Sequence, residues 1–173
     1  SINGFVLHRA IVAGIRKVVA HQDYLNKINV FPVPDGDTGT NMAFTMNAIL
    51  DGTTNHVHSR VDDMLEAVAD SSLDGARGNS GAILAQFFQG LSDGSVGLES
   101  MNAKKLAIAF RKGSEYARDA LSEPKEGTIL TVINDFSKKL EELSKKYKIS
   151  RERVRQIEVN ALQKLQREVK LNN

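Results

Sequence analysis

Apolar residues recur three and four positions apart along most of the chain, which is the spacing of one buried helix face. The first such run ends before His21, and a second begins near Thr38. The same spacing predicts further helices at about 61–73, from 80 to the glycine-rich loop at 92–97, at 103–121, from 128 to Tyr147, and at 151–169. No stretch alternates convincingly between apolar and polar residues, so the pattern predicts an all-α protein of about seven helices.

Proline and glycine mark the breaks between these helices. Residues 27–37 are predicted to form a loop, because two prolines and a glycine fall within them. Residues 74–78 are predicted to form a turn, and Asn79 or Ser80 is expected to cap the helix that follows.

Composition fits one globular domain and excludes several classes of protein. The chain has 173 residues, of which 41% are hydrophobic, and this suits a domain of ordinary size with a small appendage. No run approaches the roughly 20 apolar residues of a membrane helix, and the first residues show no signal-peptide pattern. Cysteine is absent, so disulfides and thiolate metal sites are excluded, and we expect a cytoplasmic protein without a membrane span.

The net charge of +2 conceals an uneven distribution. Residues 137–173 hold 11 Lys/Arg and 5 Asp/Glu, whereas residues 1–136 hold 12 Lys/Arg and 16 Asp/Glu. An acidic body with a basic tail suggests two different partners. A basic segment attracts phosphate backbones, although clusters of Lys and Arg are more often the solvated face of a helix.

Two aspartates in the proline-rich loop point to metal chemistry. Asp35 and Asp37 alternate across Gly36, and in a tight loop this spacing can aim both carboxylates at one point. Such oxygen ligands suit Mg²⁺, which usually keeps water and substrate phosphates as its other ligands. The helix start at 38–41 offers backbone N–H groups that favour anions. Taken alone, Asp-Gly-Asp is more often a turn that caps a helix, and an EF-hand is excluded because Met46 stands in place of its last glutamate.

Two further helix starts are rich in small residues. Residues 75–81 open the helix after the predicted turn, and residues 126–128 open a later one. Either stretch alone is compatible with an ordinary capped turn. Three such N-termini in one helical domain can converge on one polyphosphate, because small residues leave backbone N–H groups accessible.

These three stretches resemble motifs of one known family. They read NVFPVPDGDTGTNM at 29–42, ARGNSGAIL at 76–84 and EGTILTV at 126–132. In this order they resemble the nucleotide-binding, DhaL-type domain of the dihydroxyacetone kinase family, and most closely its fatty acid kinase branch. The resemblance covers about residues 5–136. It implies an α-helical barrel of about eight helices that binds ATP or ADP and two Mg²⁺ ions at one end. It also implies phosphoryl transfer to a small hydroxyl or acyl substrate that a partner protein presents.

The resemblance assigns roles to individual residues. Asp35 and Asp37 match the family's metal-binding aspartates and are the predicted catalytic residues, and Asn29 is the best match for a further metal ligand. The positions that match nucleotide contacts are Thr38, Gly39, Thr40, Asn41, Asn79, Ser80, Gly81 and Thr128. None of the histidines is assigned a role.

The tail resembles a different family. Its pattern predicts a helix, a short turn and a second helix capped by Ser150, which is a helix-turn-helix outline. Residues 137–167 resemble the DNA-reading helix-turn-helix of bacterial sigma factor region 4. In that family, the positions that match Arg151, Glu152, Arg155 and Gln156 read a promoter element. This resemblance implies DNA or RNA polymerase as a partner.

The two resemblances leave three functions open. We expect an ATP- and Mg²⁺-binding kinase domain at 1–136, incomplete at its C-terminal end, followed by a basic tail at 137–173. The alternatives are a DNA-binding regulator that acts through the tail and a catalytically silent fragment. The tail is either a separate hairpin or a replacement for the missing barrel helices, and its origin is a natural fusion, a frame-altered gene or an engineered chimera.

Overall fold

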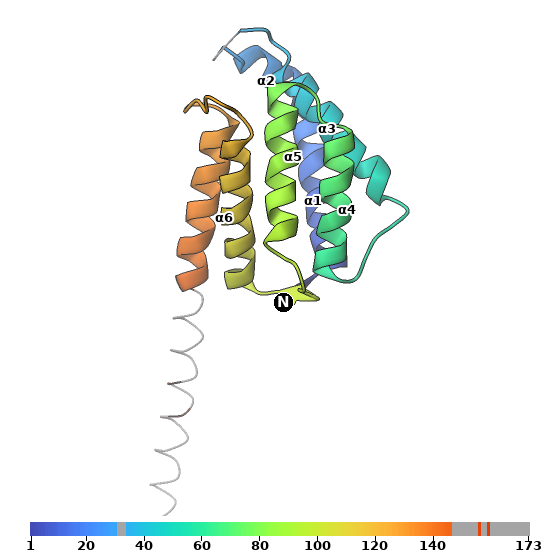
Figure 1. Cartoon of the computed structure of the whole chain (residues 1–173), viewed down its shortest axis with the longest axis vertical. Helices are drawn as coiled ribbons and strands as arrows, with labels where there is room; N and C mark the ends of the chain where they lie inside the picture. Colours follow the sequence, from blue (N-terminus) through green and yellow to red (C-terminus); the bar gives the residue numbers. More distant parts are fainter. Residues whose placement is uncertain (31–33, 147–155, 157–158, 160–173) are drawn as a thin grey trace, which may run out of the picture.

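The computed structural model describes residues 1–30, 34–146, 156 and 159. The helices are α1 (Gly4–Ala20), α2 (Gln22–Ile28), α3 (Thr38–Thr53), α4 (Val61–Asp74), α5 (Gly78–Asp93) and α6 (Ala103–Asp119). A further helical stretch occupies 129–146. The helices stand side by side as a bundle, with α6 and residues 129–146 at one edge (Figure 1). The predicted all-α helical bundle is therefore confirmed.

Two short elements were not predicted from the sequence. The first is α2, which begins directly after α1 because the backbone N–H of His21 turns back to Val18 and closes the first helix. The predicted loop therefore begins at Asn29 instead of residue 27. The second is an antiparallel ladder of β1 (Ile2–Asn3) and β2 (Ser100–Met101). Strands of two residues are too short to show an alternating pattern.

Asparagine side chains cap the two helices that start beside this ladder. Asn3 accepts a hydrogen bond from the backbone N–H of Val6 at 3.0 Å, and Asn102 accepts one from Lys105 at 2.9 Å. Each bond satisfies an N–H group that a helix start would otherwise leave unpaired. Because the ladder joins the two caps, α1 and α6 begin at the same end of the bundle.

The start of α5 differs from the prediction that Asn79 or Ser80 caps it. The N-cap residue is Arg77, with extended backbone angles and no side-chain capping bond. The backbone N–H of Arg77 instead donates to Thr45 Oγ1 at 3.2 Å. Gly78 follows with a φ of +63°, a conformation that favours glycine. The predicted cap is wrong because a contact with α3 fixes this helix start.

The core lies between the helices of the bundle, and its largest fully buried apolar side chains are Ile49, Val61, Met64, Leu65, Val68 and Met101. The helices α5 and α6 approach closely at two glycines. A Cβ at Gly90 would lie only 2.6 Å from the Cα of Gly113. The rings of Phe110 and Phe136 lie 5.1 Å apart, so residues 129–146 pack on α6. None of the helices that the structure describes is both long and apolar enough to cross a bilayer.

The predicted boundary between body and tail falls inside the helical stretch 129–146. Ser137 and Ser144 are buried, so this part of the predicted tail packs against the bundle. The predicted turn and second helix of the hairpin lie outside the described residues, apart from Gln156 and Val159, which are helical.

Candidate functional site

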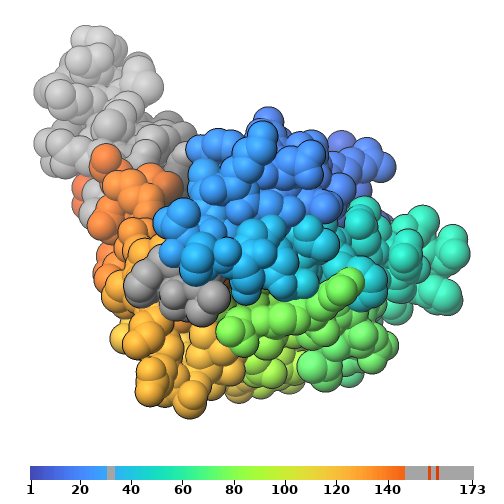
Figure 2. Space-filling model, turned by 90° about the horizontal axis from the view of Figure 1, so that it is seen from above, coloured from blue at the N-terminus to red at the C-terminus, as the bar shows by residue number. Residues whose placement is uncertain are grey.

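Three helix N-termini gather at one end of the bundle. The starts of α3 and α5 and the start of residues 129–146 all lie at the end opposite the β1–β2 ladder (Figure 1). Figure 2 looks onto this end, where atoms near the start of α3 (cyan), near the start of α5 (green) and in the loop after α6 (orange) are all visible. The convergence expected from the sequence is therefore seen for the backbone segments.

Hydrogen bonds tie the N-terminal half of α3 to the start of α5. The hydroxyl of Thr45 donates to the carbonyl of Asn41 at 2.9 Å and accepts the backbone N–H of Arg77 at 3.2 Å. Ser80 Oγ donates to the carbonyl of Thr38 across a longer distance of 3.5 Å. Two of the predicted nucleotide-contacting segments, 38–41 and 79–81, therefore lie in direct contact.

The predicted metal ligands lie on the surface beside this contact. Asp35 is exposed and accepts a hydrogen bond from Asn29 Nδ2 at 2.6 Å. Asp37 is the exposed N-cap residue of α3, and its side chain makes no capping bond. The structure thus brings Asn29 and Asp35 together, with Asp37 two residues further along the chain.

This donor set fits Mg²⁺. Within the described residues no three His, Asp or Glu side chains group as a metal site, but Mg²⁺ needs only one or two protein carboxylates besides water and phosphate oxygens. Asp35 and Asp37 supply two carboxylates. The Nδ2 of Asn29 donates to Asp35, and the amide oxygen of Asn29 is a third oxygen donor. All of these donors are hard oxygen atoms.

Two residues of α2 that the sequence did not single out hold the first turn of α3. Asn26 accepts the backbone N–H of Thr40 and donates to its hydroxyl, both at 3.0 Å. Gln22 donates to the same hydroxyl at 3.4 Å. The two side chains stand one helical turn apart, and recognition of α2 as a helix would have placed them on one face.

The predicted glycine contacts have a packing role. Gly39 lies under α2, and a Cβ there would collide with the carbonyl oxygen of Gln22. A Cβ at Gly81 would lie 2.6 Å from Thr45 Oγ1. Both positions allow neighbouring helices to approach α3 closely.

The third predicted segment is organised locally. Thr128 Oγ1 donates to the carbonyl of Lys125 at 2.8 Å and accepts the backbone N–H of Leu130 at 3.2 Å. The pKa of Glu126 is lowered by hydrogen bonds from Thr131 and then from Arg118. No hydrogen bond among the described residues joins Thr128 to α3 or α5, so only its place at this end of the bundle links it to the site.

Among the remaining predicted residues, Asn41 is buried in α3, and the others are exposed or lie outside the described residues. Asn79 is exposed in the first turn of α5. Among the predicted DNA-reading residues, Arg151, Glu152 and Arg155 lie outside the described residues, and Gln156 is helical and exposed. The prediction that the tail contacts DNA or RNA polymerase stays a prediction.

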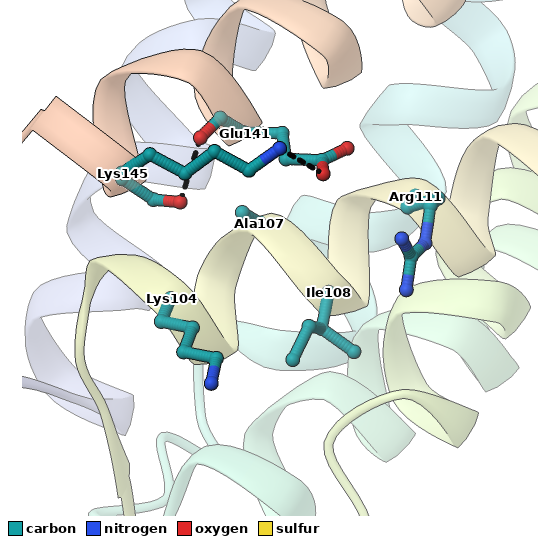
Figure 3. Close-up of a pocket in the computed structure, with 7 residues that line it drawn as sticks. Lys104, Ala107, Ile108, Arg111, Glu141 and Lys145 are labelled. Atoms are coloured by element: carbon teal, nitrogen blue, oxygen red, sulfur yellow. Dashed lines mark hydrogen bonds and ion pairs between the residues drawn. The ribbon is translucent and has the colours of Figure 1, made fainter.

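A groove of about 360 Å³ lies elsewhere, between α6 and the helical stretch 129–146. Figure 3 shows residues that line it: Lys104, Ala107, Ile108 and Arg111 on α6, and the ion pair of Glu141 and Lys145 on the stretch 129–146, whose charged atoms are 2.9 Å apart. The groove includes the first turns of α6, which begin at the ladder end of the bundle. Its position separates it from the three converging N-termini.

The sequence model of one family, described as the DAK2 domain, matches residues 32–170. That match spans more than half of the chain. The chain belongs to the DAK2 domain family. The resemblance of residues 29–42, 76–84 and 126–132 to a dihydroxyacetone kinase domain is thereby confirmed, and the match also runs through most of the predicted tail.

The chain is also similar to longer curated proteins. Uncharacterised proteins of Staphylococcus saprophyticus and of Staphylococcus aureus strains USA300 and NCTC 8325 are each 40% identical to this chain over 134 residues. The aligned region is 78% of this chain and 24% of each relative. The chain therefore spans about a quarter of the length of these proteins.

Proposed function

We propose that this DAK2 domain binds ATP or ADP together with Mg²⁺ and serves as the nucleotide-binding part of a phosphotransferase. The observation that carries the proposal is the contact between the first turns of α3 and α5 beside Asp35 and Asp37. Helix N-termini present backbone N–H groups and a positive dipole end, both of which favour phosphate. Exposed carboxylates next to such a cradle suit a cation that bridges protein and phosphate oxygens.

In this proposal each group has a distinct task. Asp35 and Asp37 hold Mg²⁺, with the amide oxygen of Asn29 as a further ligand. The first turns of α3 and α5 receive the phosphates through their backbone N–H groups, and the hydroxyl of Thr38 is a further donor. When bound, Mg²⁺ neutralises negative charge on the phosphates. The protein groups fix the position of the terminal phosphate and leave it open to an acceptor from outside.

We propose further that the acceptor, a small alcohol or an acyl carboxylate, is presented by a partner protein or by another domain. The candidate site lies on the surface at one end of the bundle, and its two aspartates are exposed. The groove between α6 and 129–146 is not at that end, so it offers no acceptor pocket beside the phosphates. Presentation by a second protein surface would complete the site.

Isothermal titration with ADP in the presence and absence of Mg²⁺ tests the nucleotide site. We expect binding that depends on Mg²⁺ and weakens at least about tenfold in Asp35→Ala and in Asp37→Ala, because loss of one metal–carboxylate interaction costs more than about 1.4 kcal/mol.

Asp51→Ala is the matched control, because Asp51 is an exposed aspartate on α3 roughly 20 Å along the helix axis from Asp37. Its removal changes the net charge equally and should leave the affinity unchanged. Absence of ADP binding, or equal weakening in all three variants, would contradict the proposed site.

A further inference from the structure

The side chain of Asn26 binds the first turn of α3 through both of its polar atoms. Its Oδ1 accepts the backbone N–H of Thr40, and its Nδ2 donates to Thr40 Oγ1, each at 3.0 Å. The orientation of the amide follows from this network, because the backbone N–H can only donate. Gln22 lies one turn earlier on α2 and donates to the same hydroxyl.

The N–H of Thr40 is the group that the N-cap residue of a helix ordinarily binds. Asp37 is the N-cap residue of α3, which makes Thr40 the third residue of the helix. An aspartate at the N-cap usually accepts the N–H of the second or third helical residue. Here the carboxylate of Asp37 makes no such bond, and Asn26 occupies the N–H instead. Asp37 is thereby left as an exposed carboxylate without a capping task.

The same contacts orient the hydroxyl of Thr40. Its oxygen accepts from Asn26 and from Gln22, so its own proton points away from both amides. Within the described residues, the N–H groups of Thr38 and Gly39 have no hydrogen-bond acceptor. Among the residues that the structure describes, two backbone donors and one hydroxyl donor of the first turn of α3 therefore have no acceptor.

We propose that Asn26 is a positioning residue that caps α3 in place of Asp37. It thereby keeps the Asp37 carboxylate available to a divalent cation and the Thr40 proton available to a phosphate oxygen. This inference rests on the proposed function for the identity of the ligands. The capping itself is a property of the protein without ligands and can be tested separately.

Thermal unfolding without metal or nucleotide tests the capping. Asn26→Ala should lower the Tm by no more than about 2–4 °C, the usual effect of a lost cap in a chain of this size, because Asp37 can partly replace the lost cap. In that background the carboxylate of Asp37 can take the vacant N–H of Thr40. Asp37→Ala should therefore lower the Tm about 2–4 °C more in the Asn26→Ala protein than in the unchanged protein.

The interaction of the Asp37 charge with the helix dipole is common to both backgrounds and cancels in this comparison. Asn47→Ala is the control, because Asn47 is an exposed asparagine of the same helix, and it should not lower the Tm, since alanine is the better helix former. Equal effects of Asp37→Ala in the two backgrounds would overturn the capping role of Asn26.

Titration with ADP and Mg²⁺ tests the consequence for the site. We expect Asn26→Ala to weaken ADP binding at least about tenfold in the presence of Mg²⁺ and to reduce the difference that Mg²⁺ makes, whereas Asn47→Ala binds normally. An affinity of Asn26→Ala within about twofold of the unchanged protein, alongside a clear loss in Asp37→Ala, would overturn the positioning role. If the unchanged protein does not bind ADP, the proposed function and the ligand part of this inference both fail, and the thermal comparison still decides the capping.

Discussion

Replacing Gly39 by alanine should destabilise the protein, although alanine is the better helix residue. Gly39 is buried in the first turn of α3, directly under α2. An added Cβ would collide with the carbonyl oxygen of Gln22 and would lie 2.9 Å from both Asn26 Oδ1 and Leu25 Cβ. One obstacle is backbone and another is a hydrogen-bonded amide, so neither can rotate away, and α2 must shift as a unit.

The balance of two opposing effects sets the size of this loss. Overpacking of a tight contact costs about 1–3 kcal/mol, and a shift of α2 also strains the bonds from Asn26 to Thr40, worth about 0.5–1.5 kcal/mol each. The gain in helix propensity from glycine to alanine is at most about 1 kcal/mol. We therefore expect Gly39→Ala to lower the free energy of unfolding by about 1–3 kcal/mol.

Gly14→Ala is the matched control, because Gly14 lies within α1 and no atom stands within 4 Å of an added Cβ. It should stabilise the protein by about 0.5–1 kcal/mol. Urea denaturation followed by circular dichroism measures both variants. If Gly39→Ala proves as stable as the unchanged protein while Gly14→Ala gains stability, the reasoning about the contact between α2 and α3 is wrong.

Two further predictions concern hydrogen bonds away from the site. Tyr116 donates to Asp93 Oδ2 at 2.6 Å and is the main cause of the lowered pKa of Asp93. Tyr116→Phe should therefore raise that pKa toward its ordinary value, as measured by NMR titration. Arg60 lowers the pKa of Asp62, chiefly through a side-chain hydrogen bond. The pKa of Asp62 in the folded protein lies below the ordinary value of 3.8. The stability that the Arg60–Asp62 pair contributes is therefore present above pH 3.8 and is lost as the pH falls through the folded pKa. Acid denaturation curves should therefore be less steep in Arg60→Ala below about pH 4, and an unchanged curve would contradict the pairing.

The helices could be predicted from the sequence because their signals are local. The apolar spacing placed α3, α4 and α6 to within a few residues, and glycines marked the loops on either side of α5. The predicted cap of α5 was wrong because a contact that is not local in sequence fixes the start of this helix. The rule that favours asparagine or serine at an N-cap is local, whereas the start of α5 is held by Thr45, more than 30 residues earlier on α3.

The same distinction applies to the candidate site. Asp35 and Asp37 could be identified from the sequence because two aspartates at this spacing can form a metal site. Asn26 could not be identified in this way, because its role is a hydrogen-bonded contact with Thr40, which is 14 residues away across the proline-rich loop. A side chain that positions another residue leaves no pattern in the sequence until both helices and their contact are known.

The structure also changes how variants of the glycine-rich motifs should be interpreted. The sequence suggested that Gly39 and Gly81 admit a ligand, but the atoms nearest to their missing Cβ positions belong to neighbouring helices. Loss of nucleotide binding on substitution there would therefore combine damaged packing with damaged contacts. Asp35 and Asp37 are exposed, and Asp37 carries no capping bond, so their removal disturbs the fold least. The two aspartates are for this reason the positions at which binding can be tested apart from folding.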